Sequence, residues 1–148
     1  MKRLFLLLIG AMLSVTLMAQ SSSADKIVGT WKAIQNGVTS KVSITKKGNG
    51  YQAQVIWVDN LKKEDGSIRT DEKNPDKSKR NTPANKIILI ESVTYNQSDK
   101  IWDNGTVYDP TKGKTYKVEL SLKDADKTLC VKGKWGPFSQ TVYWSRLQ

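Results

Sequence analysis

Hydrophobic and polar residues alternate with a period of two along most of this chain, as expected for β-strands that bury one face. Val42 and Ile44 alternate with serine and threonine, and Tyr116, Val118 and Leu120 alternate with lysine, glutamate and serine. The same pattern continues almost everywhere after the N-terminal segment. It predicts an all-β protein.

Turn-forming residues separate these alternating runs. Lys47-Gly48-Asn49-Gly50 supplies a hairpin turn, and Asp109-Pro110-Thr111-Lys112-Gly113 combines proline, which presets φ, with glycine, which permits left-handed geometry. The expected strands are the segment around Trp31 and the runs 42–45, 51–57, 87–95, 101–108, 116–122, 128–135 and 140–147. About eight strands in this order predict an antiparallel meander, and closing it into a barrel removes the exposed edges.

One long charged loop, residues 59–86, interrupts the pattern. It carries eight basic and six acidic side chains and almost no apolar ones. A connection of this length within a compact domain is usually either functional or disordered. Asn74-Pro75-Asp76 is a helix-capping sequence, so we expect at most a short helix of one or two turns after it.

The N-terminus has the pattern of a secretory signal peptide. Lys2 and Arg3 precede an apolar run that ends near Ala19. A retained membrane anchor is the less favoured alternative, because glycine, serine and threonine interrupt this run. We therefore expect a signal peptide over 1–19, a flexible lead-in over 20–26 and a single β-barrel domain over 27–148. The mature protein would be periplasmic or secreted, with no transmembrane span.

Basic residues outnumber acidic ones. The chain has 24 Lys+Arg and 14 Asp+Glu, and the predicted leader contains two of the cations, so the mature chain carries 24 − 2 − 14 = +8. Such an excess favours anionic envelope components such as lipid or acidic polysaccharide, or simply keeps the protein soluble. The cations are scattered among the strands and interleaved with acids, so no specific nucleic-acid module is expected.

The inventory of reactive residues argues against an enzyme. The chain has no histidine, and its single cysteine, Cys130, has no partner for an internal disulfide and no histidine to activate it. No cluster of residues suits a metal, and no motif indicates a cofactor. Asp103 and Asp109 leave a carboxylate-dependent hydrolase as a third hypothesis, although nothing in the sequence sets their separation.

The two ends of the predicted domain carry complementary groups. Gly29-Thr30-Trp31 begins it, and Trp144-Ser145-Arg146 lies at its end. A guanidinium over an indole face gains cation–π attraction, and a glycine lets the neighbouring backbone approach closely. We therefore expect Gly29, Trp31 and Arg146 to close the barrel. This arrangement resembles the signature of the lipocalin-like, or calycin, superfamily.

A second resemblance covers most of the mature chain. Its motifs are Gly29-Thr30-Trp31, Asn74-Pro75-Asp76 with Arg80, Trp102, Gly105-Thr106-Val107-Tyr108-Asp109-Pro110, Gly113-Lys114-Thr115-Tyr116, Leu129-x-Val131-x-Gly133 and Trp144-Ser145-Arg146. Together they resemble the exported bacterial proteins of the domain of unknown function 2147 family. The resemblance implies a lipocalin-like barrel in the periplasm or outside the cell, with no established activity.

The chain departs from that family pattern in its long loop. Some members have a Cys-x-x-Cys pair there and this chain has none, so a redox or metal role does not carry over. Ala84-Asn85-Lys86 stands where the family usually has apolar residues and a glycine, and Lys79 stands where it tends to have leucine. The way the long loop packs in the family therefore does not carry over to this chain.

Aromatic residues are the candidates for a ligand site. Rings together with carboxylates and amides suit small ligands, although the same residues also build tightly turning hairpins and fill cores. The predicted ligand-binding residues are Trp57, Arg80, Trp102, Tyr108 and Tyr116. The first hypothesis is an exported barrel that binds a small hydrophobic or amphipathic ligand at its open end. The alternative is an interaction protein that uses its cationic exterior on an anionic envelope component or a protein partner.

Overall fold

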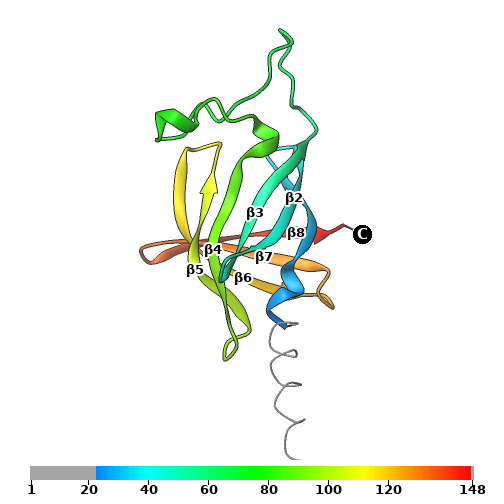
Figure 1. Cartoon of the computed structure of the whole chain (residues 1–148), viewed down its shortest axis with the longest axis vertical. Coiled ribbons are helices and arrows are strands. Elements are labelled where there is room, and N and C mark those ends of the chain that lie inside the picture. The colour runs from blue at the N-terminus through cyan, green and yellow to red at the C-terminus, as the bar shows by residue number, and fades with distance from the viewer. Residues whose placement is uncertain (1–22, 148) are drawn as a thin grey trace, which may run out of the picture.

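A computed structural model describes residues 23–147 and shows a closed antiparallel barrel of eight strands (Figure 1). The strands are β1 (Gly29–Gln35), β2 (Val38–Lys47), β3 (Gly50–Val58), β4 (Ile88–Asn96), β5 (Ile101–Asp109), β6 (Lys114–Lys123), β7 (Thr128–Trp135) and β8 (Phe138–Arg146). Each strand pairs with the next, and β8 pairs with β1. The predicted all-β meander closed into a barrel is confirmed. The predicted signal peptide lies outside the described residues.

The barrel has two different ends. The short 3-10 helix η1 (Asp25–Ile27) lies at one end, and the long loop between β3 and β4 lies at the other (Figure 1). That loop contains two further 3-10 helical turns, η2 (Lys77–Lys79) and η3 (Ala84–Lys86). Within residues 23–147, no helix is long and apolar enough to span a membrane.

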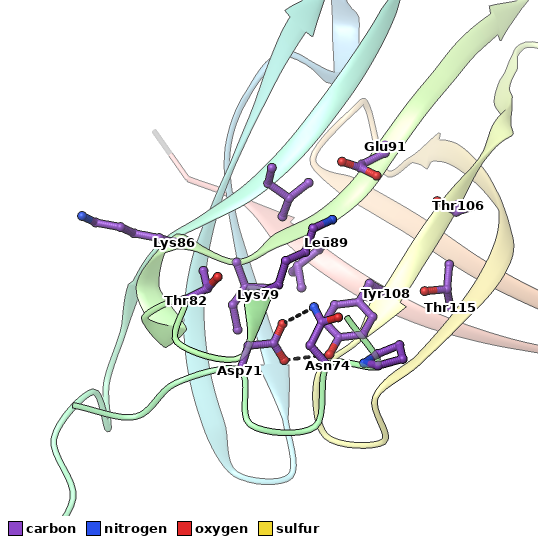
Figure 2. A pocket seen from close by; sticks show the side chains of 13 residues that line it. Asp71, Asn74, Lys79, Thr82, Lys86, Leu89, Glu91, Thr106, Tyr108 and Thr115 are labelled. Atoms are coloured by element: carbon purple, nitrogen blue, oxygen red, sulfur yellow. Dashed lines mark hydrogen bonds between the residues drawn. The ribbon is translucent and has the colours of Figure 1, made fainter. Parts of the chain in front are cut away.

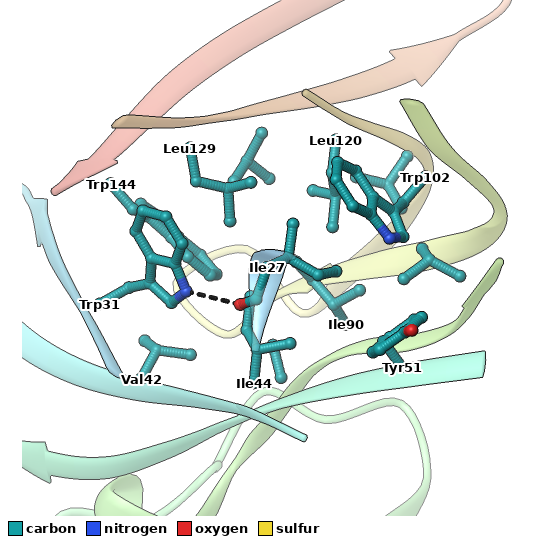
Figure 3. Close-up of a cluster of buried hydrophobic side chains, with 14 residues drawn as sticks. Ile27, Trp31, Val42, Ile44, Tyr51, Ile90, Trp102, Leu120, Leu129 and Trp144 are labelled. Carbon is teal, nitrogen blue, oxygen red and sulfur yellow. Dashed lines mark hydrogen bonds between the residues drawn. The ribbon is translucent and has the colours of Figure 1, made fainter. Parts of the chain in front are cut away.

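The core lies inside the barrel, toward the end that η1 closes (Figure 3). Its members are Ile27, Trp31, Val42, Ile44, Tyr51, Ala53, Ile90, Val93, Trp102, Val118, Leu120, Leu129, Val131 and Trp144.

 In the usual alternation of a strand, every second residue points inward, which is why Leu129 and Val131 are buried while their neighbours on β7 are not. Burial of this much apolar surface is the main force that stabilises the barrel, since the described residues contain no disulfide.

The segment before β1 plugs the closed end of the barrel. Ile27 has no exposed surface, and its carbonyl accepts a hydrogen bond from Trp31 Nε1 at 3.0 Å (Figure 3). Trp102 Nε1 donates to the carbonyl of Ala24 at 2.9 Å, and Tyr51 donates to the carboxylate of Asp25. Ala24 and Asp25, which fall in the expected lead-in over 20–26, thus form hydrogen bonds with the barrel. The two buried indole N–H groups need acceptors, and this backbone supplies them.

The predicted closure residues meet beside this plug. Trp31 pairs with Arg146 across β1 and β8, and the guanidinium carbon lies 4.2 Å from the centre of the indole ring. Gly29 has a φ of 141°, and a Cβ there would lie 3.2 Å from the Arg146 side chain. Only glycine combines that backbone angle with so close an approach.

Candidate functional site

The long charged loop is folded against the barrel and not left free. Two isolated bridges, Lys62 with Ile68 and Thr70 with Pro83, fold it back on itself. Asp76 caps η2 by accepting a hydrogen bond from the backbone N–H of Ser78, so the short helix expected after Asn74-Pro75-Asp76 is present but begins after Asp76 and not at Pro75. Hydrogen bonds from Ser78 lower the pKa of the Asp76 carboxyl, which keeps the cap ionised.

A buried carboxylate fastens the loop to β5. Asp71 is 3% exposed, and its two oxygens accept hydrogen bonds from Tyr108 Oη at 2.7 Å and from Asn74 Nδ2 at 2.8 Å (Figure 2). Burial, followed by the hydrogen bond to Asp71, raises the pKa of Tyr108. The phenol therefore stays protonated and keeps donating to the carboxylate.

A second contact fastens the loop to the turn between β5 and β6. Lys73 Nζ donates to the carbonyl of Thr111 at 2.8 Å. Gly113 has a φ of 64°, and a Cβ at this position would lie 2.1 Å from the Lys73 carbonyl oxygen. The close approach of the loop backbone depends on glycine at this turn.

Between this loop and the sheet lies a pocket of about 280 Å³ (Figure 2). The loop contributes Asp71, Asn74, Pro75, Lys79 and Thr82. The sheet side and the segment that leads into it contribute Lys86, Ile87, Ile88, Leu89, Glu91, Thr106, Tyr108 and Thr115. The lining thus combines apolar side chains, threonine hydroxyls and charges of both signs.

The sheet wall of the pocket belongs to the outer face of the barrel. Glu91 pairs with Thr106 across β4 and β5, and Tyr108 pairs with Thr115 across β5 and β6. These positions alternate with Ile90 and Val107, which pair with each other and pack in or against the core. Because successive side chains of a strand point to opposite faces, the pocket is built on the face away from the core.

Two of the five predicted ligand-binding residues belong to this region. Tyr108 lines the pocket. Arg80 follows η2, and its Nε donates to the carbonyl of Asn74 at 2.7 Å, so it shapes the loop without lining the pocket.

The other three predicted residues lie elsewhere and do not meet. Trp102 is 2% exposed and belongs to the core beside the plug. Tyr116 packs against Trp135, with ring centroids 5.3 Å apart, and lies on the same face of β6 as the buried Val118. Trp57 is 43% exposed and lies 5.1 Å from Lys41 Nζ.

A β-bulge accounts for the position of Trp57. Its alternation with Val55 predicts that both side chains face inward, but the pairing register shifts so that Trp57 lies opposite Lys41 while Val55 lies opposite Val42. Val42 is buried, so its neighbour Lys41 faces outward, and Trp57 faces outward with it.

Sequence reasoning did not select the other polar residues of the pocket. Asp71 is one of six acids in a charged loop, and no local pattern distinguishes a buried carboxylate from an exposed one. Lys79 was noted only as a departure from a family pattern. Of the two carboxylates considered for hydrolysis, Asp109 accepts hydrogen bonds from the backbone and side chain of Thr111, as in a turn.

Comparisons with known proteins agree with this architecture. Residues 29–146 match the family described as "Uncharacterized protein conserved in bacteria (DUF2147)". The fold is similar to the solved structure of protein HP1028 from Helicobacter pylori, which is described as belonging to the lipocalin family. The TM-score is 0.65 at 22% identity, with 82% of this chain and 83% of that chain covered. No match was found among curated proteins. The chain therefore belongs to the DUF2147 family and has a lipocalin-like barrel fold.

Proposed function

We propose that this protein is an exported binding protein that holds a small amphipathic ligand in the pocket beneath the long loop. The pocket itself carries the proposal, because it combines an apolar stretch, Ile87, Ile88 and Leu89, with hydroxyl and charged groups. Its volume of about 280 Å³ lies just below the usual range for ligand pockets, roughly 300–1,000 Å³, which fits a small ligand. Export is the expectation from the N-terminal sequence pattern.

The fold supports the same proposal in general terms. Eight-stranded barrels of the lipocalin type commonly hold one small ligand. Here the described pocket lies on the outer face, so the proposal differs from the expected site at the open end of the barrel. The anchored loop would form one wall of the site and keep the apolar stretch partly shielded from water.

Filling the pocket tests this proposal. Thr115 lines the pocket on an outward-facing strand position, and Thr115→Trp would occupy the space. Thr141→Trp is the matched control, because Thr141 pairs with Lys132 on the outer side of β8, away from the pocket. Octanoate, octylamine and L-leucyl-L-leucine serve as probes, and backbone amide shifts of residues 87–91 and 106–108 report binding.

We expect saturable shifts with at least one probe in the unmodified protein and in the control variant. In Thr115→Trp the affinity should fall at least about tenfold, a loss of about 1.4 kcal/mol of binding free energy. A complete absence of saturable shifts, or equal binding by both variants, would contradict the proposal.

The alternative is binding of an anionic envelope component by the cationic exterior. Lys117 lies directly opposite Lys134 on the outer face of β6 and β7, where Lys134 forms an ion pair with Glu119. Titrations at several ionic strengths distinguish the two functions. Charge-driven association with anionic vesicles should weaken steeply as ionic strength rises to physiological values, whereas binding in the pocket should change little.

A further inference from the structure

We infer that the pocket selects a zwitterionic ligand, one that carries a primary ammonium and an anionic group on a small apolar frame, such as a short peptide. The inference rests on the proposed function and specifies its ligand class. Lys79 and Glu91, two opposite charges that line the same pocket, carry it.

Neither side chain forms a hydrogen bond or an ion pair within residues 23–147, although the charge of Lys79 helps to lower the pKa of the nearby Asp76 carboxyl. Two other lysines of this loop do have partners: Lys63 pairs with Glu72 at 2.7 Å, and Lys73 donates to the Thr111 carbonyl at 2.8 Å. Of the charges in the lining, Lys79 and Glu91 can therefore each accept a ligand group of opposite charge without giving up a hydrogen bond or an ion pair of their own.

The two charges enter the pocket from different walls. Lys79 extends its ammonium along the pocket in the direction of Glu91 on β4, whereas Lys86 points away from the pocket (Figure 2). Lys79 is the last residue of η2, whose N-terminus is held by the Asp76 cap. The cation is thus carried by an ordered turn and not by a free loop.

The remaining carboxylate in the lining cannot take over the role of Glu91. Both oxygens of Asp71 already accept hydrogen bonds, from Tyr108 and Asn74, and the side chain is buried. Glu91 is exposed and has no side-chain hydrogen bond or ion pair within residues 23–147, so a ligand ammonium would pair with it.

Pairing both charges at once favours a ligand with both signs. A ligand that covers the apolar stretch displaces water from the pocket and removes solvent from any charge left unpaired there. A singly charged ligand would leave either Lys79 or Glu91 unpaired and shielded from water, whereas a zwitterion pairs both. The hydroxyls of Thr82, Thr106 and Thr115 can orient the polar atoms between the two charges.

Three dipeptides with identical side chains test the inference. L-leucyl-L-leucine carries both charges, its N-acetyl derivative carries only the anion, and L-leucyl-L-leucinamide carries only the cation. Each is titrated while the amide shifts of residues 87–91 and 106–108 are followed. We expect the zwitterion to bind at least about tenfold more tightly than either capped form.

Variants that remove one charge show which protein residue binds which charged end of the ligand. Glu91→Gln should abolish the preference for the free ammonium, and Lys79→Met should abolish the preference for the free carboxylate. Lys77→Met and Glu64→Gln are the matched controls, because they make the same two residue changes at positions of the long loop that do not line the pocket. Both controls should keep the full preference for the zwitterion.

The same pair of charges occurs in a peptide and in an ethanolamine phospholipid headgroup. Dihexanoylphosphatidylethanolamine, titrated below its micelle concentration, distinguishes these sources. Tighter binding of the dipeptide assigns a peptide ligand, and tighter binding of the lipid assigns the headgroup; either result supports the inference.

Two outcomes would contradict the zwitterion inference, and they differ in whether they also contradict the proposed function. If all three dipeptides bind equally well and Thr115→Trp still blocks them, the zwitterion inference fails and the proposed function stands. If neither the dipeptides nor octanoate and octylamine give a saturable response, both fail together.

Discussion

At the scale of single residues, Arg146 joins the most distant parts of the chain. Its guanidinium lies over the ring of Trp31 and donates to the carbonyls of Lys26, Val28 and Asp126. One planar side chain thereby ties together the plug, the start of β1 and the turn before β7. Lysine has the same charge but lacks the planar fork of donors.

Arg146→Lys should therefore destabilise the protein although the charge is kept. We expect a loss of about 1–2 kcal/mol in the free energy of unfolding, because two or more hydrogen bonds and part of the cation–π contact are lost. Urea denaturation measures the effect. Arg69→Lys is the control, since the side chain of Arg69 donates a hydrogen bond to the Asn60 carbonyl within the long loop, and it should change barrel stability by less than about 0.5 kcal/mol. An equal effect of both substitutions would refute this role of Arg146.

At the scale of elements, the strands and the long loop are ordered by different interactions. The strands follow from local alternation, which the sequence displays and the structure confirms. The loop has almost no apolar residues, and the contacts of Asp71 and Lys73 with the β5–β6 hairpin hold it in place. Those contacts join residues about 40 positions apart in the chain, so no local sequence pattern predicts them.

Tyr108→Phe should loosen the loop without unfolding the barrel. The buried Asp71 carboxylate would lose one of its two side-chain donors, at a cost of about 1–3 kcal/mol. Hydrogen exchange of the Asp71 amide, which bonds the Thr82 carbonyl, should accelerate at least about tenfold, while amides of β7 keep their protection.

Tyr143→Phe is the control for this measurement. Tyr143 is 57% exposed on β8, and its ring stacks with Lys123 Nζ at 4.2 Å, so its hydroxyl is not part of the loop contact. Exchange in the loop should be unchanged in this variant. Equal exchange rates in both variants and the unmodified protein would show that the Tyr108 hydroxyl does not hold the loop.

At the scale of the whole molecule, the barrel is stabilised by a core that includes a segment outside its strands. Ile27 of η1 is fully buried among side chains from the barrel wall, and the adjoining backbone accepts hydrogen bonds from Trp31 and Trp102. The plug is therefore part of the folded unit. Removing its apolar anchor would leave a cavity at the closed end.

Ile27→Ala should lower the free energy of unfolding by about 2–4 kcal/mol, the usual cost of truncating a fully buried isoleucine. Val28→Ala is the matched control, because Val28 is 39% exposed, and it should cost less than about 1 kcal/mol. Urea denaturation of both variants makes the comparison. Similar costs for the two substitutions would mean that the plug contributes little to stability.

The amino-acid sequence by itself determined the strands, their order and the groups that meet where the barrel closes. Alternation with a period of two separates buried from exposed positions locally, and Gly29, Trp31 and Arg146 stand at the ends of that pattern. Only the tertiary structure decided which aromatic residues are accessible. Trp57 and Trp102 both lie in strands, yet a bulge turns one outward and the plug covers the other.

The pocket also depends on the tertiary structure alone. Lys79 belongs to a loop and Glu91 to a strand, and nothing in their local sequence relates them. They face one space because the buried Asp71–Tyr108 hydrogen bond folds the loop onto the outer face of β4 and β5. Strand periodicity is a local property that a sequence displays directly, whereas a site between a loop and a sheet exists only once long-range contacts have formed.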